Sequence, residues 1–119
     1  MLSRTDLLEY AKDKYNTVSE KLWLKYPSYE VLRHEKNRKW YAIIMGVQKN
    51  KVGLNEEGLI DILDVKCEPG LIPILLRQKG FAPAYHMSKE HWISIILNGS
   101  VNDEEIYNLL DGSYKMTNN

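Results

Sequence analysis

Apolar side chains along the chain repeat at two spacings, one typical of helices and one typical of strands. The stripe nearest the N-terminus has helical spacing and consists of Leu7, Leu8, Ala11 and Tyr15. Ser3 precedes it, with Asp6 three residues later as in a capping box, which predicts a helix over about residues 3–16. Near the C-terminus, Asn102 is the expected N-cap with Glu105 at the third helical position. The stripe of that helix consists of Ile106, Leu109, Leu110 and Tyr114.

A shorter helix is predicted in the middle of the chain, within "EPGLIPILLRQKG". Its apolar stripe consists of Ile72, Leu75 and Leu76. Gly80 follows this stripe and is expected to end the helix. Pro73 has no amide N–H and is tolerated only in a first turn, so the helix should begin near Gly70 or Leu71.

The segments between the helices predict strands. Tyr29 and Val31 precede the polar turn "HEKN", and "RKWYAIIMGV" follows it as the returning strand of a hairpin. That returning strand is apolar on both faces, which indicates a central strand covered at least in part on both sides. The strand "LIDILDVKC" should place Leu63, Val65 and Cys67 on one face, and Asp64 and Lys66 on the other.

A second hairpin is predicted where "FAPAYHM" and "HWISIIL" flank "SKE". The expected order is then α-β-β-β-α-β-β-α. This order predicts an α+β two-layer sandwich, in which an antiparallel sheet of about five strands carries helices on one side. Residues 1–119 should form a single domain. The predicted core consists of Leu8, Ala11, Ile43, Val65, Leu75, Ile95, Ile106 and Leu110.

Composition excludes several classes of protein. Hydrophobic residues make up 44% of the chain and charged residues 27%, as in an ordinary globular domain. Cys67, the single cysteine, cannot form an intrachain disulfide or a cysteine-rich zinc site. No apolar segment is long enough to span a bilayer, and the N-terminus lacks the apolar region of a signal peptide. We therefore expect a cytoplasmic protein with no membrane partner.

Charge is balanced overall but segregated along the chain. The 16 basic and 16 acidic residues sum to zero, which argues against a generic nucleic-acid binder. The first hairpin nevertheless carries four cations against Glu35, namely Arg33, Lys36, Arg38 and Lys39. Charged residues at a hairpin tip usually face water. As a wing lying along DNA, the same turn would contact phosphates, and Arg33 or Arg38 could enter a minor groove.

Residues 85–92 concentrate side chains able to bind ligands, namely Tyr85, His86, Lys89, His91 and Trp92. If "MSKE" is the turn, His86 and His91 face the same way and could hold a metal with Cys67. No carboxylate or further histidine has a known ligand spacing, so we predict no metal and no cofactor. No nucleophile elbow, P-loop or paired-carboxylate motif is present, so no enzyme is predicted. Trp92, which enters an apolar strand, is expected in the core.

Three segments resemble the MmcQ/YjbR family, namely "WLKYPSYEVLRHEKNRKWYAII", "VKCEP" and "AYHMSKEHWISI". Lys66, Cys67 and Pro69 match the second motif. The third motif is matched by Tyr85, His86, Met87, Lys89, His91 and Trp92. The sequence "PSY" departs from the glycine-bearing aromatic turn that the family often has. The resemblance implies a CyaY-like or secretion-chaperone-like α+β fold and the double-wing type of DNA-binding domain, the latter by structural analogy.

Two functions from different classes follow as expectations. The first is a DNA-binding domain whose contacts are Arg33, Lys36, Arg38, Lys39 and Lys89. The alternative is a protein-interaction or chaperone-like adaptor that works through the sheet face, which the neutral net charge favours. A shared binding surface for either partner would consist of Lys66, Tyr85, His86, His91 and Trp92, because aromatics interleaved with cations can stack on bases and pair with phosphates. A metal-binding or catalytic role is third.

Overall fold

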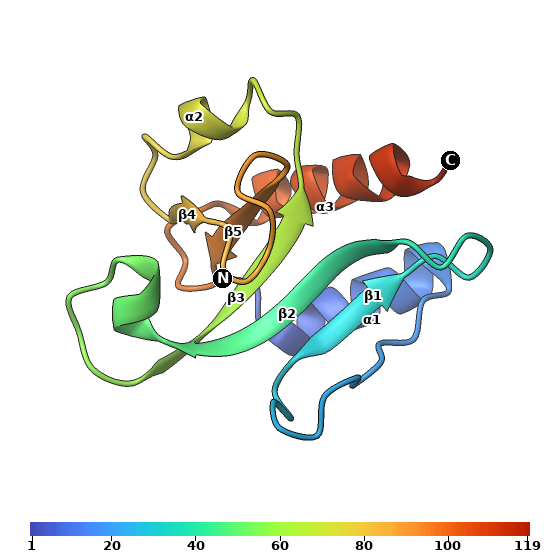
Figure 1. The fold of residues 1–119 in the computed structure, drawn as a ribbon, viewed down its shortest axis with the longest axis horizontal. Coiled ribbons are helices and arrows are strands. Elements are labelled where there is room, and N and C mark those ends of the chain that lie inside the picture. Colours follow the sequence, from blue (N-terminus) through green and yellow to red (C-terminus); the bar gives the residue numbers. More distant parts are fainter.

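A computed structural model describes residues 1–119 and shows five strands, three α-helices and one 3-10 helix (Figure 1). In chain order the elements are α1 (Arg4–Tyr15), β1 (Glu30–Arg33), β2 (Trp40–Gln48), η1 (Lys49–Val52), β3 (Leu59–Lys66), α2 (Ile72–Leu75), β4 (Phe81–Pro83), β5 (Trp92–Ile96) and α3 (Asp103–Thr117). This is the predicted order of helices and strands. The polar loop after β2 additionally contains the short 3-10 helix η1. None of the helices is long and apolar enough to cross a membrane.

The five strands form one antiparallel sheet in the order β1-β2-β3-β5-β4. Each hairpin supplies one edge strand, because β1 pairs only with β2 and β4 only with β5. At the β1 edge, a short backbone bridge joins Val31 to Glu20 in the preceding segment. The predicted α+β architecture is therefore confirmed.

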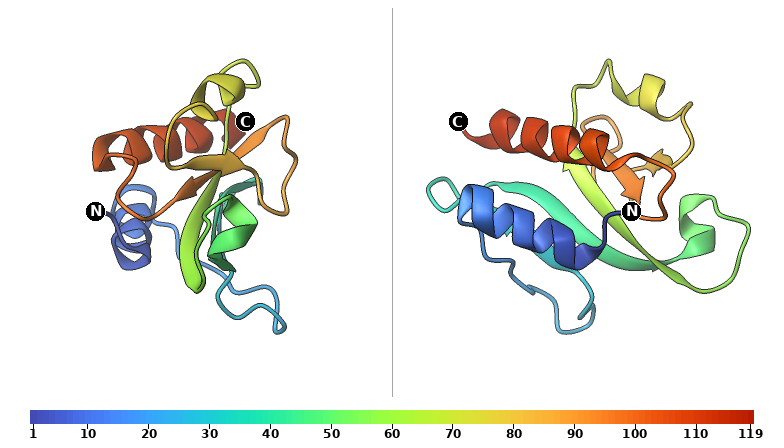
Figure 2. Two further views of the ribbon diagram at one scale, coloured as in Figure 1. Left: turned by 90° about the vertical axis from the view of Figure 1, so that its left-hand side faces the viewer. Right: turned by 180° about the vertical axis from the view of Figure 1, so that it is seen from behind.

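The two long helices lie side by side on one face of the sheet (Figure 2). Each begins where the sequence predicts. The Ser3 side chain and the Asp6 carboxylate form a reciprocal capping box at α1, and the Asn102 side chain accepts from the amide of Glu105 at α3. These caps satisfy backbone N–H groups that would otherwise lack partners in the first turn.

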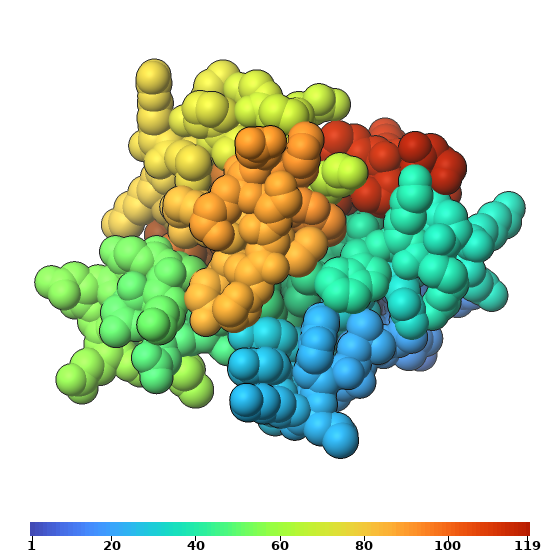
Figure 3. Space-filling view, in the orientation of Figure 1, coloured from blue at the N-terminus to red at the C-terminus, as the bar shows by residue number.

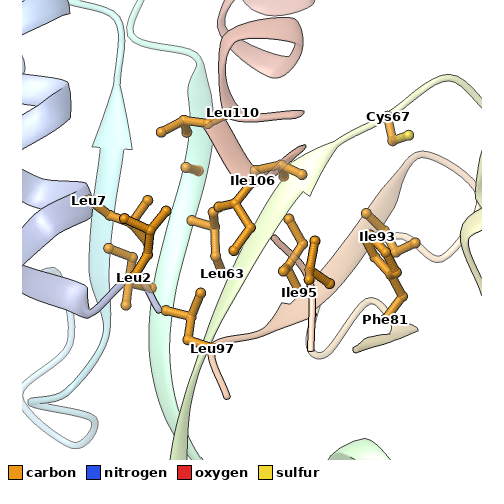
Figure 4. Packing of buried hydrophobic residues seen from close by; sticks show 14 of the residues in the cluster. Leu2, Leu7, Leu63, Cys67, Phe81, Ile93, Ile95, Leu97, Ile106 and Leu110 are labelled. Atoms are coloured by element: carbon orange, nitrogen blue, oxygen red, sulfur yellow. The ribbon is translucent and has the colours of Figure 1, made fainter. Parts of the chain in front are cut away.

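The main core fills the space between these helices and the sheet (Figure 4). Leu7 of α1 and Leu110 of α3 are fully buried there, packed over Leu63 and Ile95 from the sheet. Of the predicted core residues, all but Leu8 are buried, and Leu8 is half-buried against the same cluster.

The opposite face of the sheet has a second apolar cluster that includes Ile43, Met45 and Ile62. Neither α1 nor α3 covers it. Segments without regular secondary structure, residues 18–29 and 84–91, lie over this face together with η1 (Figure 3). The prediction that β2 is buried on both faces is thus correct, although loops rather than helices supply the second cover.

Two predicted boundaries were wrong. Helix α2 ends at Leu75, and Gly80 instead turns the chain into β4 with a φ of 98°. Strand β4 ends at Pro83, so the second hairpin has a loop over residues 84–91 rather than a turn at "SKE". Proline cannot donate a ladder hydrogen bond, and the amide of Tyr85 donates to the Ser94 side chain at 3.0 Å instead of to the backbone.

Candidate binding surface

Both hairpins turn at the same end of the sheet. Ala42 of β2 pairs with Val65 of β3, and Lys66 of β3 pairs with Trp92 of β5. The beginnings of β2 and β5 therefore lie on either side of the end of β3. The turn 34–39 projects from this end, which we call the hairpin end of the sheet. The loop 84–91 leaves the same end and lies over the second face of the sheet, and both segments are visible in Figure 3. The arrangement brings together the two segments that carry most of the predicted site residues.

Two cations of the first hairpin are paired with one carboxylate. The Arg33 guanidinium donates to Glu20 through Nε at 2.6 Å and through Nη2 at 2.8 Å, and Arg38 approaches the same carboxylate at 3.4 Å. The hydrogen bond from Arg33 holds the pKa of Glu20 below its ordinary value. Arg33 is thus less available to phosphate than the sequence suggests.

The turn 34–39 is anchored to the end of α3. His34 is buried, and its Nε2 lies 2.7 Å from the Thr117 hydroxyl. The Asn37 side-chain amide donates to the Thr117 carbonyl at 2.8 Å. Burial lowers the pKa of His34, which favours its neutral form. These contacts fix a turn whose exposed cations are Lys36, Arg38 and Lys39.

The loop 84–91 is closed by its own hydrogen bonds. The Lys89 ammonium donates to the Ala84 carbonyl at 3.0 Å, and the Trp92 amide donates to the Ser88 carbonyl at 2.9 Å. Tyr85 is half-buried and Trp92 is buried, so the prediction that Trp92 lies in the core is confirmed. Lys66 is half-buried at the end of β3.

The structure does not produce the cross-strand histidine pair that the metal hypothesis requires. His86 lies within the loop in a left-handed conformation, φ 61°, and is outside any strand register with His91. Both side chains are exposed. Cys67 is buried, and its backbone N–H donates to the His91 carbonyl at 2.8 Å. No three metal-ligating side chains come together.

A buried carboxyl lies beneath this loop and was not singled out by the sequence. Asp64 is fully buried in β3, where its Oδ1 accepts from the Ser94 hydroxyl and its Oδ2 has no hydrogen-bond partner. Burial raises the pKa of Asp64 to about 7, against smaller opposing effects of Ser94 and Lys89. In the sequence Asp64 stands between the apolar residues Leu63 and Val65, which was the available signal.

An apolar pocket of about 300 Å³ opens on the loop-covered face. Its aromatic wall consists of Trp23, Tyr26, Tyr29 and Trp40. The Trp23 and Trp40 rings are perpendicular at 5.7 Å between centroids, and the Tyr26 and Tyr29 rings are stacked at 4.8 Å. The remaining lining residues are Ile43, Met45, His86 and Met87. We call this the aromatic pocket, and no acidic side chain lines it.

Sequence reasoning missed the aromatic pocket because three segments distant in sequence build it. Trp23 comes from the segment before β1, Trp40 from β2 and Met87 from the loop 84–91. The density of aromatic residues in "LWLKYPSY" was the available signal. Of the predicted site residues, only His86 lines this pocket.

Fold and site together define a small α+β domain that presents two hairpin loops and an aromatic pocket. Residues 12–116 match the YjbR family, and the chain belongs to that family. It is 46% identical over 117 residues to the uncharacterized protein YyaQ of Bacillus subtilis, and the match covers 98% of this chain and 99% of that protein. It is 36% identical over 58 residues to the uncharacterized protein YjbR of Escherichia coli, covering 48% and 49% of the two chains.

Solved structures share the fold. A crystal structure of a protein from Pseudomonas syringae is 40% identical, covers 98% of this chain and 99% of its own, and superposes with a TM-score of 0.95. A Deinococcus radiodurans protein is 22% identical and covers 98% of this chain and 78% of its own, with a TM-score of 0.73. The family resemblance inferred from the motifs is thereby confirmed.

Proposed function

We propose that this chain is a non-enzymatic DNA-binding domain that lays the turn 34–39 and the loop 84–91 along a duplex. The observation that carries the proposal is the placement of both loops at one end of the sheet. Lys36, Arg38 and Lys39 are exposed on one loop and Lys89 on the other. Cations on two loops that leave the same end of the sheet can follow a phosphate backbone and fix orientation without reading bases.

The charges set the expected strength of this binding. The chain has no net charge, and Glu20 already pairs with Arg33 and Arg38. Binding to duplex DNA should therefore rest on few phosphate contacts. We expect a dissociation constant on the order of 10⁻⁵ M at physiological salt, with strong salt dependence.

The test is a titration of labelled duplex at low and moderate salt with the double variant Lys36→Glu/Lys39→Glu. Removing one phosphate contact should weaken binding to every sequence and reduce the log–log salt slope by roughly one. The matched control is Arg77→Glu/Lys79→Glu, which makes the same charge change at two exposed cations between α2 and β4. Equal weakening in both double variants would mean that net charge alone governs binding, and the two loops would have no special role.

The second candidate is a protein-interaction adaptor. Its supporting observation is a set of exposed apolar side chains on α2 and around it, namely Leu71, Ile74 and Leu76. Absence of duplex binding even at low salt, with a folded wild-type protein, would place the adaptor ahead.

A further inference from the structure

The aromatic pocket lies beside the two proposed DNA-contacting loops and shares residues with both hairpins. Trp40 begins β2 directly after the turn 34–39, and His86 and Met87 belong to the loop 84–91. A strand held along these loops would therefore pass next to the pocket.

The size and walls of the aromatic pocket favour a flat ring system. A volume of about 300 Å³ is at the lower end for small-molecule sites, so one planar ring system fits better than an extended ligand. Trp23, Trp40 and Tyr29 supply aromatic surface, and bases stack on such side chains whatever their sequence. His86 adds ring nitrogens that can donate to or accept from the polar edge of a base.

Charge decides between the two ligand classes that aromatic walls can hold. Aromatic cages also bind quaternary ammonium groups, but here no acidic side chain lines the pocket to pair with a cation. Lys25 adjoins Tyr26 and Lys89 follows Met87 by two residues, and both are exposed. Asp64, beside Ile43 in the sheet, does not line the pocket. The surroundings therefore suit an aromatic group that carries an anion, which is the chemistry of a nucleotide.

We infer that the aromatic pocket binds an unpaired nucleobase, with its phosphate held by the neighbouring cations. The inference rests on the proposed function in that the two loops deliver the strand. Extruding a base costs least where it is already unpaired, mismatched or single-stranded. The domain would then prefer DNA with an unpaired base to a perfect duplex.

The direct test uses tryptophan fluorescence, because two of the three tryptophans line the pocket and the third does not. The probes are a short duplex with one unpaired thymidine, the same duplex fully paired, and free thymidine monophosphate. The unpaired base should quench the fluorescence of the wild type. Trp23→Phe and Trp40→Phe should each reduce the quenching, and Trp92→Phe should leave it intact.

Affinity provides the second readout. Tyr26 lines the pocket and is more than a third exposed, whereas Leu24, two residues earlier, is fully exposed and does not line it. Tyr26→Ala should weaken binding of the duplex with the unpaired base about fivefold or more, since stacking on one aromatic side chain is worth at least that factor. Binding of the paired duplex should not change. Leu24→Ala should alter neither.

The outcomes separate the two proposals. Equal affinity for both duplexes without quenching would overturn the nucleobase pocket, and weakening of both by Lys36→Glu/Lys39→Glu would still support the proposed function. Quenching by thymidine monophosphate without binding of either duplex would support the base site but make a free nucleotide its ligand, and would refute DNA binding. Quenching that survives in both Trp23→Phe and Trp40→Phe would place the base elsewhere and overturn the inference.

Discussion

Arg33 and Glu20 form a bidentate ion pair that joins the segment before β1 to the hairpin, with donor–acceptor distances of 2.6 and 2.8 Å. The planar guanidinium matches the carboxylate, so each of its two bonded nitrogens contacts a separate oxygen. Arg38 lies 3.4 Å from the same carboxylate. Glu20 therefore pairs with two of the cations that were predicted to contact DNA.

Replacing Glu20 should therefore strengthen DNA binding if the hairpin contacts phosphate. In Glu20→Gln the competing anion of the two arginines is removed, and we expect higher affinity and a log–log salt slope steeper by roughly one. Titrations of labelled duplex at several salt concentrations measure both. Glu35→Gln is the control, because it makes the same change of net charge within the turn 34–39 but removes no ion pair. An equal gain in both variants would show that the Glu20 pair is irrelevant.

The buried Asp64 should make the protein less stable as pH rises. The pKa of Asp64 is raised to about 7 in the folded state, so between about pH 4 and about pH 7 the unfolded chain releases its proton first. That difference lowers the free energy of unfolding by up to about 4 kcal/mol at neutral pH. In Asp64→Asn this pH-dependent destabilisation should disappear, while the amide oxygen still accepts from Ser94. Urea unfolding of both proteins at several pH values gives the difference, and parallel curves would contradict the expectation.

Asp111 should have the opposite pH dependence. Partial burial raises the pKa of Asp111, but hydrogen bonds from Tyr15, Lys14 and Tyr10 outweigh it and leave the pKa below its ordinary value. This stabilisation is present above the unfolded pKa and is lost as pH falls through the lowered folded pKa. Asp111→Asn should cost about 1.5–3 kcal/mol at neutral pH, the usual range for hydrogen bonds to a charged group.

Chemical denaturation at neutral and acidic pH checks the Asp111 prediction. The control is Asp13→Asn on α1, which removes an exposed carboxylate that makes no hydrogen bond. The wild type and Asp111→Asn should converge in stability at acidic pH. A difference that persists there would assign the effect to packing between α1 and α3 rather than to charge.

Two glycines should respond oppositely to alanine. Gly112 lies inside α3, and a Cβ there would meet no atom within 4 Å, so Gly112→Ala should stabilise the protein by about 0.5–1 kcal/mol. Gly80 has a positive φ, and its Cβ would lie 2.6 Å from a Val101 methyl group. Gly80→Ala should destabilise by more than about 1 kcal/mol. Melting temperatures measured by calorimetry rank the variants, and stabilisation by both would refute the steric argument.

The predictable part of this fold consists of elements with strong local patterns. The capping residues Ser3 and Asn102 mark where α1 and α3 begin, because side-chain and backbone groups meet within one turn. The two-sided apolar pattern of β2 correctly indicated cover on both faces. The length of the second hairpin was missed, because it depends on a side chain of another strand, Ser94, accepting from the Tyr85 amide.

The site was less predictable than the fold for the same physical reason. Motif residues such as His86 and Lys89 could be named as candidates because they are concentrated in a short segment. The pairing of Arg33 with Glu20, and the meeting of Trp23, Trp40 and Met87, are long-range contacts without a characteristic spacing. Only the packed sheet brings them together.

The edges of the sheet determine how a partner can bind. Strand β4 has three residues and ends at Pro83, which has no amide N–H to donate. At the other edge, Val31 of β1 already exchanges backbone hydrogen bonds with Glu20. Neither margin offers a long row of free backbone groups, so an extended peptide cannot readily join as a sixth strand. A partner must instead be recognised by side chains. For the same reason, two copies of the chain cannot readily pair their edge strands into one continuous sheet.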